Sequence, residues 1–242
     1  MARFPDTRGS LVAAVRSPDE ATRARALSTL AEAYWKPIYT YVRLHFGRSH
    51  DEAADLTQDF FARLVEKPLL ERFDPRKARL RTYLRLAVDG LVANDFQFRS
   101  RLKRGGDRRI LSLDFDAVRR EVEEHRNAGE LSPEDLFERE WVRSVFSMAV
   151  ERFRKTCARD GKELRFALFS AYDLEGDAAV ERLRYEDLAR RFDTSAVDVT
   201  NQLAAARRDF RRIVLELLRE LTVSDAEFRL EARALLGIEP VA

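Results

Sequence analysis

The sequence has a single cysteine, Cys157, so no disulfide bond can form within the chain. Glycine and proline are scarce, with 9 and 7 residues among 242, whereas charged residues make up 36% of the chain. Few helix breakers among many helix formers favour a helical protein, and no segment shows the alternation typical of a strand. We therefore predict an all-α fold. The lack of disulfides is typical of the reducing cytoplasm, where we expect the protein.

Long apolar runs are also missing from the sequence. No stretch approaches the roughly 20 apolar residues that a membrane-spanning helix requires. Residues 1–8 lack the apolar core of a signal peptide. These two absences predict that the protein does not insert into a membrane.

Signatures of catalysis and of metal binding are absent as well. Gly105-Gly106 is not followed by the Lys-Ser/Thr of a phosphate-binding loop, and the three histidines, His45, His50 and His125, have no partner at metal-ligand spacing. No catalytic triad can be assembled from the spacing of the remaining residues. We therefore predict no catalytic residue, no metal site, no cofactor and no enzymatic activity.

Charge is distributed unevenly along a chain whose net charge is only +2. Residues 72–109 contain twelve Lys and Arg against four Asp, which gives 12 − 4 = +8. Residues 110–140 contain four Arg against ten Asp and Glu, which gives 4 − 10 = −6. A basic block followed by an acidic block indicates a surface for nucleic acid and then a solvated connector.

The pattern of apolar residues predicts two helical domains joined by an acidic linker. Helical spacing extends to Gly105-Gly106, which ends a long helix expected over residues 77–102. A turn-rich stretch before Ser132-Pro133 precedes the next helix start. The predicted boundaries are a first domain over 1–106, a linker over 107–133, a second domain over 134–222 and a tail over 223–242 with one short helix.

Residues 51–64 are predicted to form an amphipathic helix with an acidic face. Asp51, Asp55 and Asp59 recur every four residues and share one side of that helix, opposite an apolar stripe. Such a face suits docking to a basic partner. Two other interpretations stay open, an ordinary solvated face and a site for a hard cation.

A second segment, from Arg76 to Arg104, interleaves basic and aromatic residues. Basic groups neutralise phosphates, and aromatic rings offer faces on which unstacked bases stack. Phe96 and Phe98 lie two positions apart and cannot both face the core of a helix. The segment therefore indicates a surface for single-stranded nucleic acid, with buried rings under an ordinary basic surface as the alternative.

Residues 185–221 have the proportions of a helix-turn-helix. Ser195 and Asp198 form a capping box for the second helix. An apolar stripe that begins at Val199 is expected to pack inward, so Asn201 falls on the opposite face. That face suits the major groove of DNA, and an ordinary helical hairpin is the alternative.

Together these segments resemble, in their order along the chain, the extracytoplasmic-function sigma factors of bacterial RNA polymerase. One departure is Leu80, at a position where the family usually has an aromatic residue. The resemblance is carried by Tyr34–Arg43, Asp55–Leu64, Arg79–Leu84, Asn94–Gly106, Leu111–Asp114, Tyr185–Ala189 and Ala206–Arg212.

This resemblance implies a promoter-specificity subunit made of a region 2 helical bundle and a C-terminal helix-turn-helix, region 4. Region 2 would bind the polymerase core at the clamp coiled coil of the β′ subunit, and would open and read the promoter −10 element. Region 4 would read the −35 element and rest on the β flap. The linker would enter the active-site channel, and an anti-sigma factor is a further partner that the resemblance allows.

The resemblance also implies three groups of site residues. The polymerase-binding residues are Asp51, Asp55, Gln58 and Asp59. The −10 DNA-binding residues are Arg79, Arg81, Tyr83, Asn94, Asp95, Phe98, Arg99, Arg101, Lys103 and Arg104. The −35 DNA-binding residues are Ser195, Val197, Asn201, Gln202, Ala205, Arg208 and Arg212.

Two other functions stay open at the level of sequence. The chain could be a stand-alone helix-turn-helix regulator of duplex DNA, or a helical adaptor that binds only proteins. Neither function depends on RNA polymerase core, so binding to core separates both of them from a sigma factor.

Overall fold

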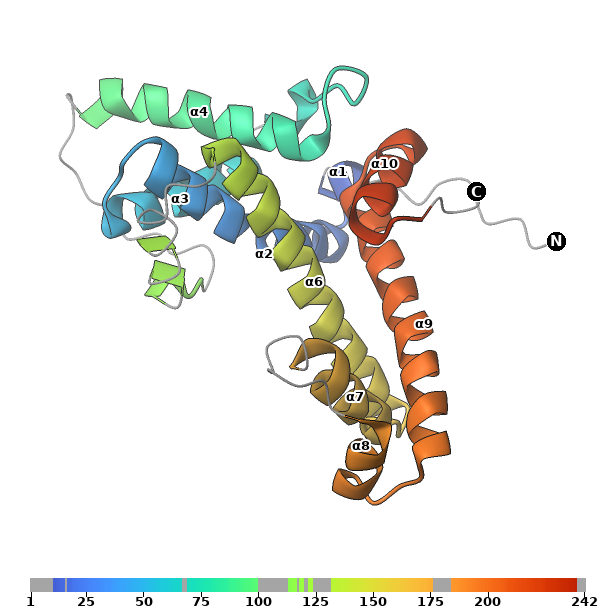
Figure 1. Cartoon of the computed structure of the whole chain (residues 1–242). Coiled ribbons are helices and arrows are strands. Elements are labelled where there is room, and N and C mark those ends of the chain that lie inside the picture. The colour runs from blue at the N-terminus through green and yellow to red at the C-terminus, as the bar shows by residue number, and fades with distance from the viewer. Residues whose placement is uncertain are drawn as a thin grey trace. The chain divides into compact units, whose positions relative to one another are not determined.

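Helices form the whole of the regular structure. The computed structural model of the protein describes residues 11–15, 17–66, 69–99, 113–116, 118–119, 122–123, 132–175 and 184–238 (Figure 1). No strand occurs among these residues, which confirms the predicted all-helical fold. The main elements are α1 (Leu11–Val15), α2 (Glu20–His45), α3 (His50–Glu66), η1 (Leu69–Arg72), α4 (Leu80–Arg99), α6 (Pro133–Arg159), α7 (Glu163–Phe169), η2 (Ser170–Leu174), α8 (Tyr185–Arg191), α9 (Ala196–Leu221) and α10 (Asp225–Leu236).

These helices divide into two compact units. The first unit consists of Met1–Ser144 and Arg219–Ala242, and the second of Val145–Leu218. Helix α6 contributes its first half to the first unit and its second half to the second, and α9 ends in the first unit. The predicted boundaries at 106, 133 and 222 divide the chain by function and stay a prediction. In the structure, the segment expected as a tail belongs to the same unit as the N-terminal helices.

Large aromatic residues fill the core of the first unit. Tyr34 and Tyr41 of α2 are each 1% exposed, and Trp141 of α6 lies beside Tyr34 with ring centroids 6.4 Å apart. The Tyr41 hydroxyl donates a 2.9 Å hydrogen bond to Asp89 of α4 and accepts one of 3.1 Å from Arg85. Because buried polar groups are stable only when they are hydrogen-bonded, these contacts fix α2 against α4.

Helix α2 is long and contains a proline. The Asp19 carboxylate accepts a 2.8 Å hydrogen bond from the backbone N–H of Thr22 and so caps the helix. The helix then runs for 26 residues with Pro37 inside it. The helix is continuous through Pro37, so no helix starts at that position.

Short polar side chains set the starts of four other helices. Ser49, Ser132, Ser195 and Ser224 each accept a hydrogen bond from the backbone N–H three residues later, at 3.0–3.3 Å. In α3, the Glu52 carboxylate also reaches back to the N–H of Ser49 at 3.1 Å, which completes a capping box. These starts follow from local sequence alone, and the predicted starts of α6 and α9 are confirmed by their caps.

The second unit is built around a small apolar cluster. Leu168 of α7, Leu188 of α8, and Val199 and Leu203 of α9 are all 0% exposed and pack together. Phe210 of α9 lies against a group of phenylalanines from α6 and α7, which are Phe146, Phe153 and Phe169. The inward stripe predicted for α9 is confirmed by this burial.

Candidate nucleic-acid interface

Helix α3 presents acidic side chains to solvent. Asp51 and Asp55 are exposed, and the opposite side of the helix is buried. Asp59 is less accessible, because it pairs with Arg63 one turn later at 2.9 Å. Gln58 is half-buried between the two sides. The acidic face predicted from the sequence is therefore present, with Asp51 and Asp55 as its exposed centre (Figure 1).

A groove lies between α3, η1 and α4, with a volume of about 570 Å³. That volume falls in the range of pockets that hold small organic groups. Its lining is mostly apolar and includes Tyr83 and Leu86 of α4, the latter 53% exposed. Gly90 adds to the opening because no side-chain atom lies within 4 Å of the place that a Cβ would occupy.

Tyr83 and Asn94 are the two predicted −10 residues that line this groove. The Tyr83 hydroxyl donates a hydrogen bond to the backbone carbonyl of Leu69, and its ring centroid lies 5.1 Å from that of Phe73. The Asn94 amide is exposed and donates a 2.8 Å hydrogen bond to the Gly90 carbonyl on its own helix. Tyr83 is therefore held by its contacts with Leu69 and Phe73. The exposed Asn94 amide can replace its hydrogen bond to Gly90 with one to a binding partner.

The start of α4 differs from the surface that the sequence predicted. Arg81 was expected to contact DNA, yet it is only 8% exposed and its guanidinium lies 4.8 Å from the ring centroid of Trp141. It forms ion pairs of 2.7 Å with Glu138 of α6 and with Glu231 of α10. In this structure Arg81 is therefore a buried residue and not part of an exposed DNA surface.

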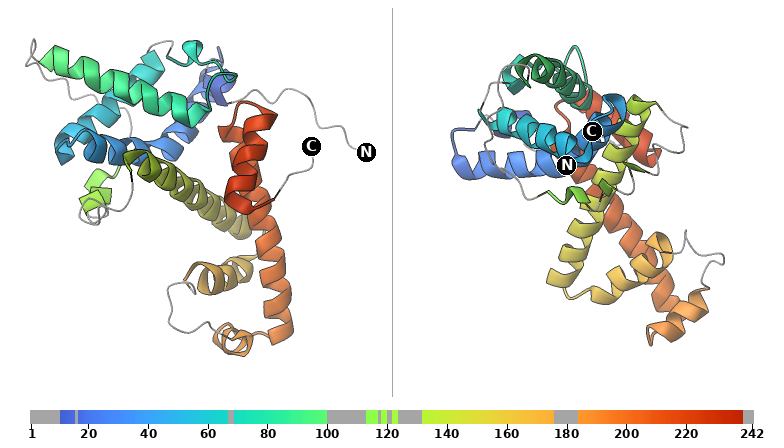
Figure 2. Two further views of the ribbon diagram at one scale, coloured as in Figure 1. Left: turned by 45° about the horizontal axis from the view of Figure 1, so that its top comes forward. Right: turned by 90° about the vertical axis from the view of Figure 1, so that its left-hand side faces the viewer.

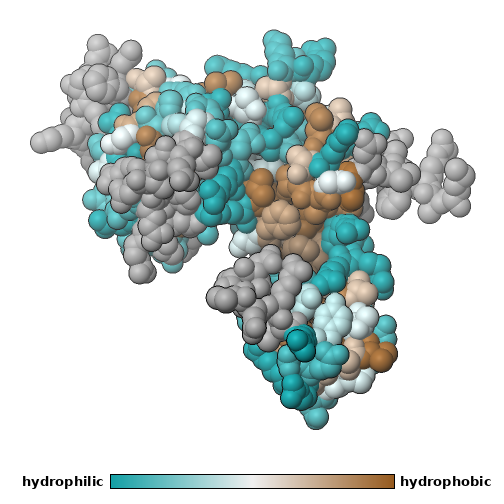
Figure 3. All heavy atoms as spheres, in the orientation of Figure 1, coloured by the Kyte–Doolittle hydropathy of each residue, from teal (hydrophilic) through white to brown (hydrophobic). Residues whose placement is uncertain are grey.

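Arg79 is accessible but also paired. Its side chain is 40% exposed, and one guanidinium nitrogen lies 3.3 Å from the same Glu231 carboxylate. The hydrophilic loop of residues 72–79 that leads into α4 lies at the top of Figure 3, and Arg76 within it pairs with Asp74 at 3.0 Å. The Arg76 guanidinium holds the pKa of the Asp74 carboxyl at about 2.

The remaining −10 predictions stay predictions. Helix α4 includes Asp95, Phe98 and Arg99 in its last described turns, and the predicted helix end at 102 lies outside the described residues. Arg101, Lys103 and Arg104 lie outside the described residues.

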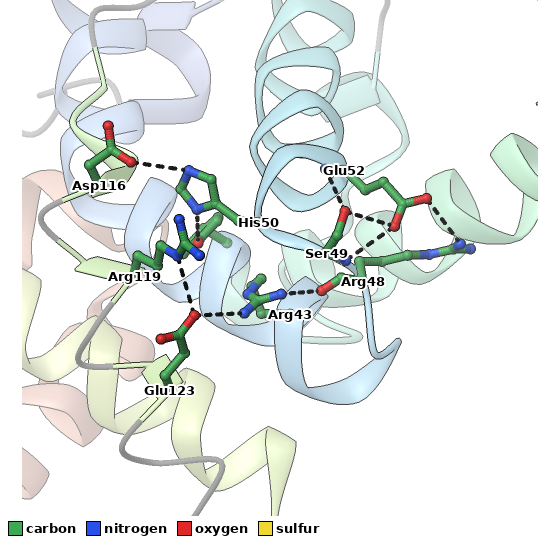
Figure 4. Close-up of polar contacts among 9 residues, drawn as sticks. Arg43, Arg48, Ser49, His50, Glu52, Asp116, Arg119 and Glu123 are labelled. Carbon is green, nitrogen blue, oxygen red and sulfur yellow. Dashed lines mark hydrogen bonds and ion pairs between the residues drawn. The ribbon is translucent and has the colours of Figure 1, made fainter.

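A piece of the acidic linker docks at the corner between α2 and α3 (Figure 4). Asp116 lies 3.3 Å from His50, whose other ring nitrogen shares a 2.7 Å hydrogen bond with Tyr39. Glu123 lies 3.7 Å from Arg43, a side chain that also donates to the backbone carbonyl of Arg48. The ring of Phe115 from the same piece packs against Trp35 and Tyr39, with centroids 5.4 and 5.2 Å apart. The sequence predicted a solvated linker and missed these contacts, since they join residues more than 60 positions apart.

In the second unit, α8 and α9 are joined by a tight turn (Figure 2). Asp193 in this turn has φ 49°, a left-handed conformation that aspartate tolerates, and Thr194 donates its N–H to the Ala189 carbonyl at 2.9 Å. Leu188 of α8 and Val199 of α9 belong to the buried apolar cluster that holds the two helices together. The first turns of α9 therefore have one side buried and the other free.

The predicted −35 residues divide into free and engaged groups. Val197, 69% exposed, and Asn201 project from the free side of α9, as does Arg208. Ser195 is exposed just before α9, but its side chain is engaged in the cap of that helix. Gln202 is engaged, because its side-chain oxygen accepts a 3.0 Å hydrogen bond from Arg165 of α7. Ala205 is half-buried, and Arg212 is exposed but pairs with Glu216 at 2.7 Å.

Arg165 and Arg207 are two residues that the sequence analysis missed. Arg165 holds Gln202 and also pairs with Asp209 at 2.9 Å, so it fixes α7 to two turns of α9. Arg207 pairs with Asp173 at 2.8 Å and lies over the ring of Tyr172. Each contact spans more than 30 residues, and no local spacing could have indicated it.

Metal-binding and membrane-spanning features are absent from the described part of the chain. No group of three or more His, Cys, Asp and Glu side chains there could hold a metal ion. Burial raises the pKa of the Cys157 thiol, which disfavours the reactive thiolate. Among the described helices, none combines the length and apolar character needed to cross a bilayer.

Comparison with known proteins identifies the segment that contains the groove. Residues 30–102, which make up less than half of the chain, match the family model of sigma-70 region 2. The matched segment covers most of α2 together with α3, η1 and α4. No curated protein and no solved structure matches the chain.

Proposed function

We propose that this chain is a sigma factor of the extracytoplasmic-function type, which directs RNA polymerase core to promoters and opens them. The observation that carries this proposal is the region 2 match over α2–α4, because that segment holds both the exposed acidic face and the groove. The cytoplasm, where transcription takes place, is the compartment that this function requires.

Docking to core is assigned to α3. Asp51 and Asp55 are exposed on a helix whose other side is anchored in the core by Leu56 and Phe60. A rigid acidic face of this kind suits a basic coiled coil such as the β′ clamp, since complementary charge steers association and fixes register. Asp59 and Gln58 form the edge of this face, where Arg63 already neutralises Asp59.

Capture of the melted −10 strand is assigned to the groove and to the end of α4. The groove offers an apolar lining and the ring of Tyr83 to an extruded base, while exposed Asn94 provides an amide for its polar edge. The basic residues Arg99, Arg101, Lys103 and Arg104 follow directly in sequence and suit the phosphates. Arg79 completes this surface at the other end of the helix.

Reading of the −35 element is assigned to α8 and α9 as a helix-turn-helix. The free side of α9 starts at Ser195 and carries Val197, Asn201 and Arg208. An asparagine can form paired hydrogen bonds with adenine, and an arginine can reach guanine or phosphate. The second unit would rest on the β flap. The acidic linker would leave its place on α2 and enter the active-site channel. An anti-sigma factor would regulate the binding of this protein to core.

The test is co-purification of the chain with RNA polymerase core, followed by run-off transcription on duplex and pre-melted templates. A sigma factor forms a stable complex with core and starts transcription at a defined site on duplex DNA. A stand-alone regulator would bind duplex DNA without core. A protein-binding adaptor would neither bind duplex DNA nor start transcription with core. Either of those two results rejects the proposal.

A further inference from the structure

The C-terminal helix α10 occupies the start of α4 through two acidic side chains. Glu227 accepts a 2.9 Å hydrogen bond from the backbone N–H of Leu80, the first residue of α4. Glu231, one turn later, lies 2.7 Å from Arg81 and 3.3 Å from Arg79. A helix more than 140 residues downstream therefore supplies both the cap and the counter-charges of this helix start.

The contact is specific, and its charges are almost completely removed from water. The Glu231 side chain is 2% exposed and that of Arg81 is 9% exposed. Burial raises the pKa of Glu231, and the nearby carboxylates Glu138 and Glu227 act in the same direction, against the opposite effect of Arg81 and Arg79. Because desolvation offsets much of the attraction in such a pair, the arrangement is better suited to select one partner than to add stability.

Helix α10 has caps of its own, and Phe228 and Ala232 pack inward while part of its surface is exposed. Ser224 caps its first turn by accepting the N–H of Glu227 at 3.1 Å, and Gly237 ends it at φ 64°. A turn of three residues, Thr222–Ser224, separates it from α9. Its own apolar side chains are not fully covered, since Leu230 is 51% exposed.

Carboxylates and phosphates are alternative ligands for the same arginines. Both offer two or more anionic oxygens to a guanidinium, in similar geometry. Arg79 stands where the proposed function places a cation beside the −10 strand, and Arg81 follows two residues later in α4. In this structure Glu231 pairs with both, and Glu138 pairs with Arg81 as well.

We propose that α10 is an internal competitor of DNA, which keeps Arg79 and Arg81 occupied by Glu231 until a nucleic-acid strand replaces it. The proposal rests on the proposed function for the identity of the strand, but the competition itself concerns only the phosphates. Undocking of α10 then frees Arg79, removes one of the two carboxylates that pair with Arg81 and leaves the N–H of Leu80 open to a phosphate.

The experiment compares Glu231→Gln with Asp225→Asn in the full chain. Both substitutions remove one negative charge from α10, but Asp225 is exposed and pairs with Arg219 of α9, so it controls for net charge. The measurement is binding of a short fluorescent single-stranded DNA across a series of salt concentrations, by the free chain and by its complex with core.

We expect Glu231→Gln to bind DNA about tenfold more tightly, as freed arginine–phosphate pairs would produce, and Asp225→Asn to bind like the parent. The slope of the logarithm of the DNA-binding constant against the logarithm of the salt concentration should become more negative by about 0.7 for each phosphate gained. In the parent chain, added DNA should speed hydrogen exchange of the α10 backbone, a readout that needs no variant to fold.

Equal effects of the two substitutions, unchanged or weaker binding by Glu231→Gln, or no DNA binding by any variant would each overturn the competition. So would an α10 whose exchange is unaffected when DNA is bound. Failure of the proposed function is separate, because it appears as a lack of binding to core whatever the free chain does with DNA.

Discussion

Helices α3 and α4 belong to the same unit and both carry charged side chains, but these side chains differ in their exposure to solvent. On α3, Asp51 and Asp55 are exposed and the helix start is capped by its neighbours Ser49 and Glu52. On α4, Arg81 is buried and the first N–H is capped by Glu227 from α10. An exposed charge can bind a partner with little loss of hydration free energy. A buried charge is already paired with a group of the same chain.

The difference shows why exposure matters more than sequence position in assigning a docking residue. Both helices were assigned functional charges from the sequence in the same way, through spacing and resemblance. Only the contacts show that the acids of α3 face outward and that the arginines at the start of α4 face a second helix. Substitutions in these helices and in α9 and α10 can break or sharpen this contrast, and the expected effect is largest at Arg81 and smallest at Glu231.

The largest effect is expected from Arg81→Ala. The change leaves Glu231 buried without its nearest cation and uncovers Trp141, so the free energy of unfolding should fall by about 3–5 kcal/mol. Urea unfolding followed by circular dichroism measures the loss. Arg79→Ala is the matched control, and its 40% exposed side chain predicts a loss of about 1 kcal/mol or less. Equal losses for the two variants would contradict the buried network.

The next effect concerns core binding through α3. Replacing Asp51 and Asp55 by lysine places like charges opposite a basic coiled coil and should weaken binding to core by about 2–4 kcal/mol. The helical signal should stay unchanged, because both side chains are exposed. Titration of labelled core measures the affinity. Asp59→Lys alone should have a smaller effect, since Arg63 already neutralises this position in the parent chain. Undiminished affinity of the double variant would remove α3 from the interface.

A smaller effect separates two neighbours on α9. Asn201 is exposed and Gln202 is held by Arg165, so Asn201→Ala should alter preference at one −35 base pair by about 1–3 kcal/mol without changing stability. Gln202→Ala should lower stability and leave the preference profile unaltered. Run-off transcription over all single −35 substitutions, together with thermal unfolding, measures both quantities. If the two variants exchange these behaviours, the facing of α9 is wrong.

The smallest effect is a pH dependence of stability from Glu231. Its folded pKa is raised above the ordinary value of 4.5, chiefly by burial, so the folded state binds more protons than the unfolded state between those two values. Stability from this group is therefore fully present below pH 4.5 and declines as pH rises toward the folded pKa, at a slope of at most about 1.4 kcal/mol per pH unit. Urea midpoints measured across this window should show the decline in the parent chain and lose it in Glu231→Gln.

The opposite shift of Asp74 provides an internal check on that measurement. Its pKa is lowered to about 2, first by the side-chain hydrogen bond from Arg76, so its contribution is lost as pH falls below 3.8. The two groups therefore act in separate pH windows and with opposite signs. A stability that rises with pH above 4.5 would mean that Glu231 does not titrate as its burial requires.

Sequence alone determined the helical class, the acidic face of α3 and the inward stripe of α9. These features depend on neighbours within a few residues, because spacing along one helix decides which side chains share a face. The capping serines Ser132 and Ser195 are likewise visible in the sequence, since each acts on an N–H only three residues away.

Tertiary structure decided which charges are free. Arg81 and Asn201 were equally good candidates in the sequence, but one is buried under Trp141 and the other is exposed. The sequence predicted a short helix in the tail but not the position of that helix in the fold. In the structure, its carboxylates Glu227 and Glu231 contact the start of α4, some 150 residues earlier in the chain. An arginine is a docking residue or a buried counter-ion according to what packs against it, and packing between distant segments is set by the fold as a whole.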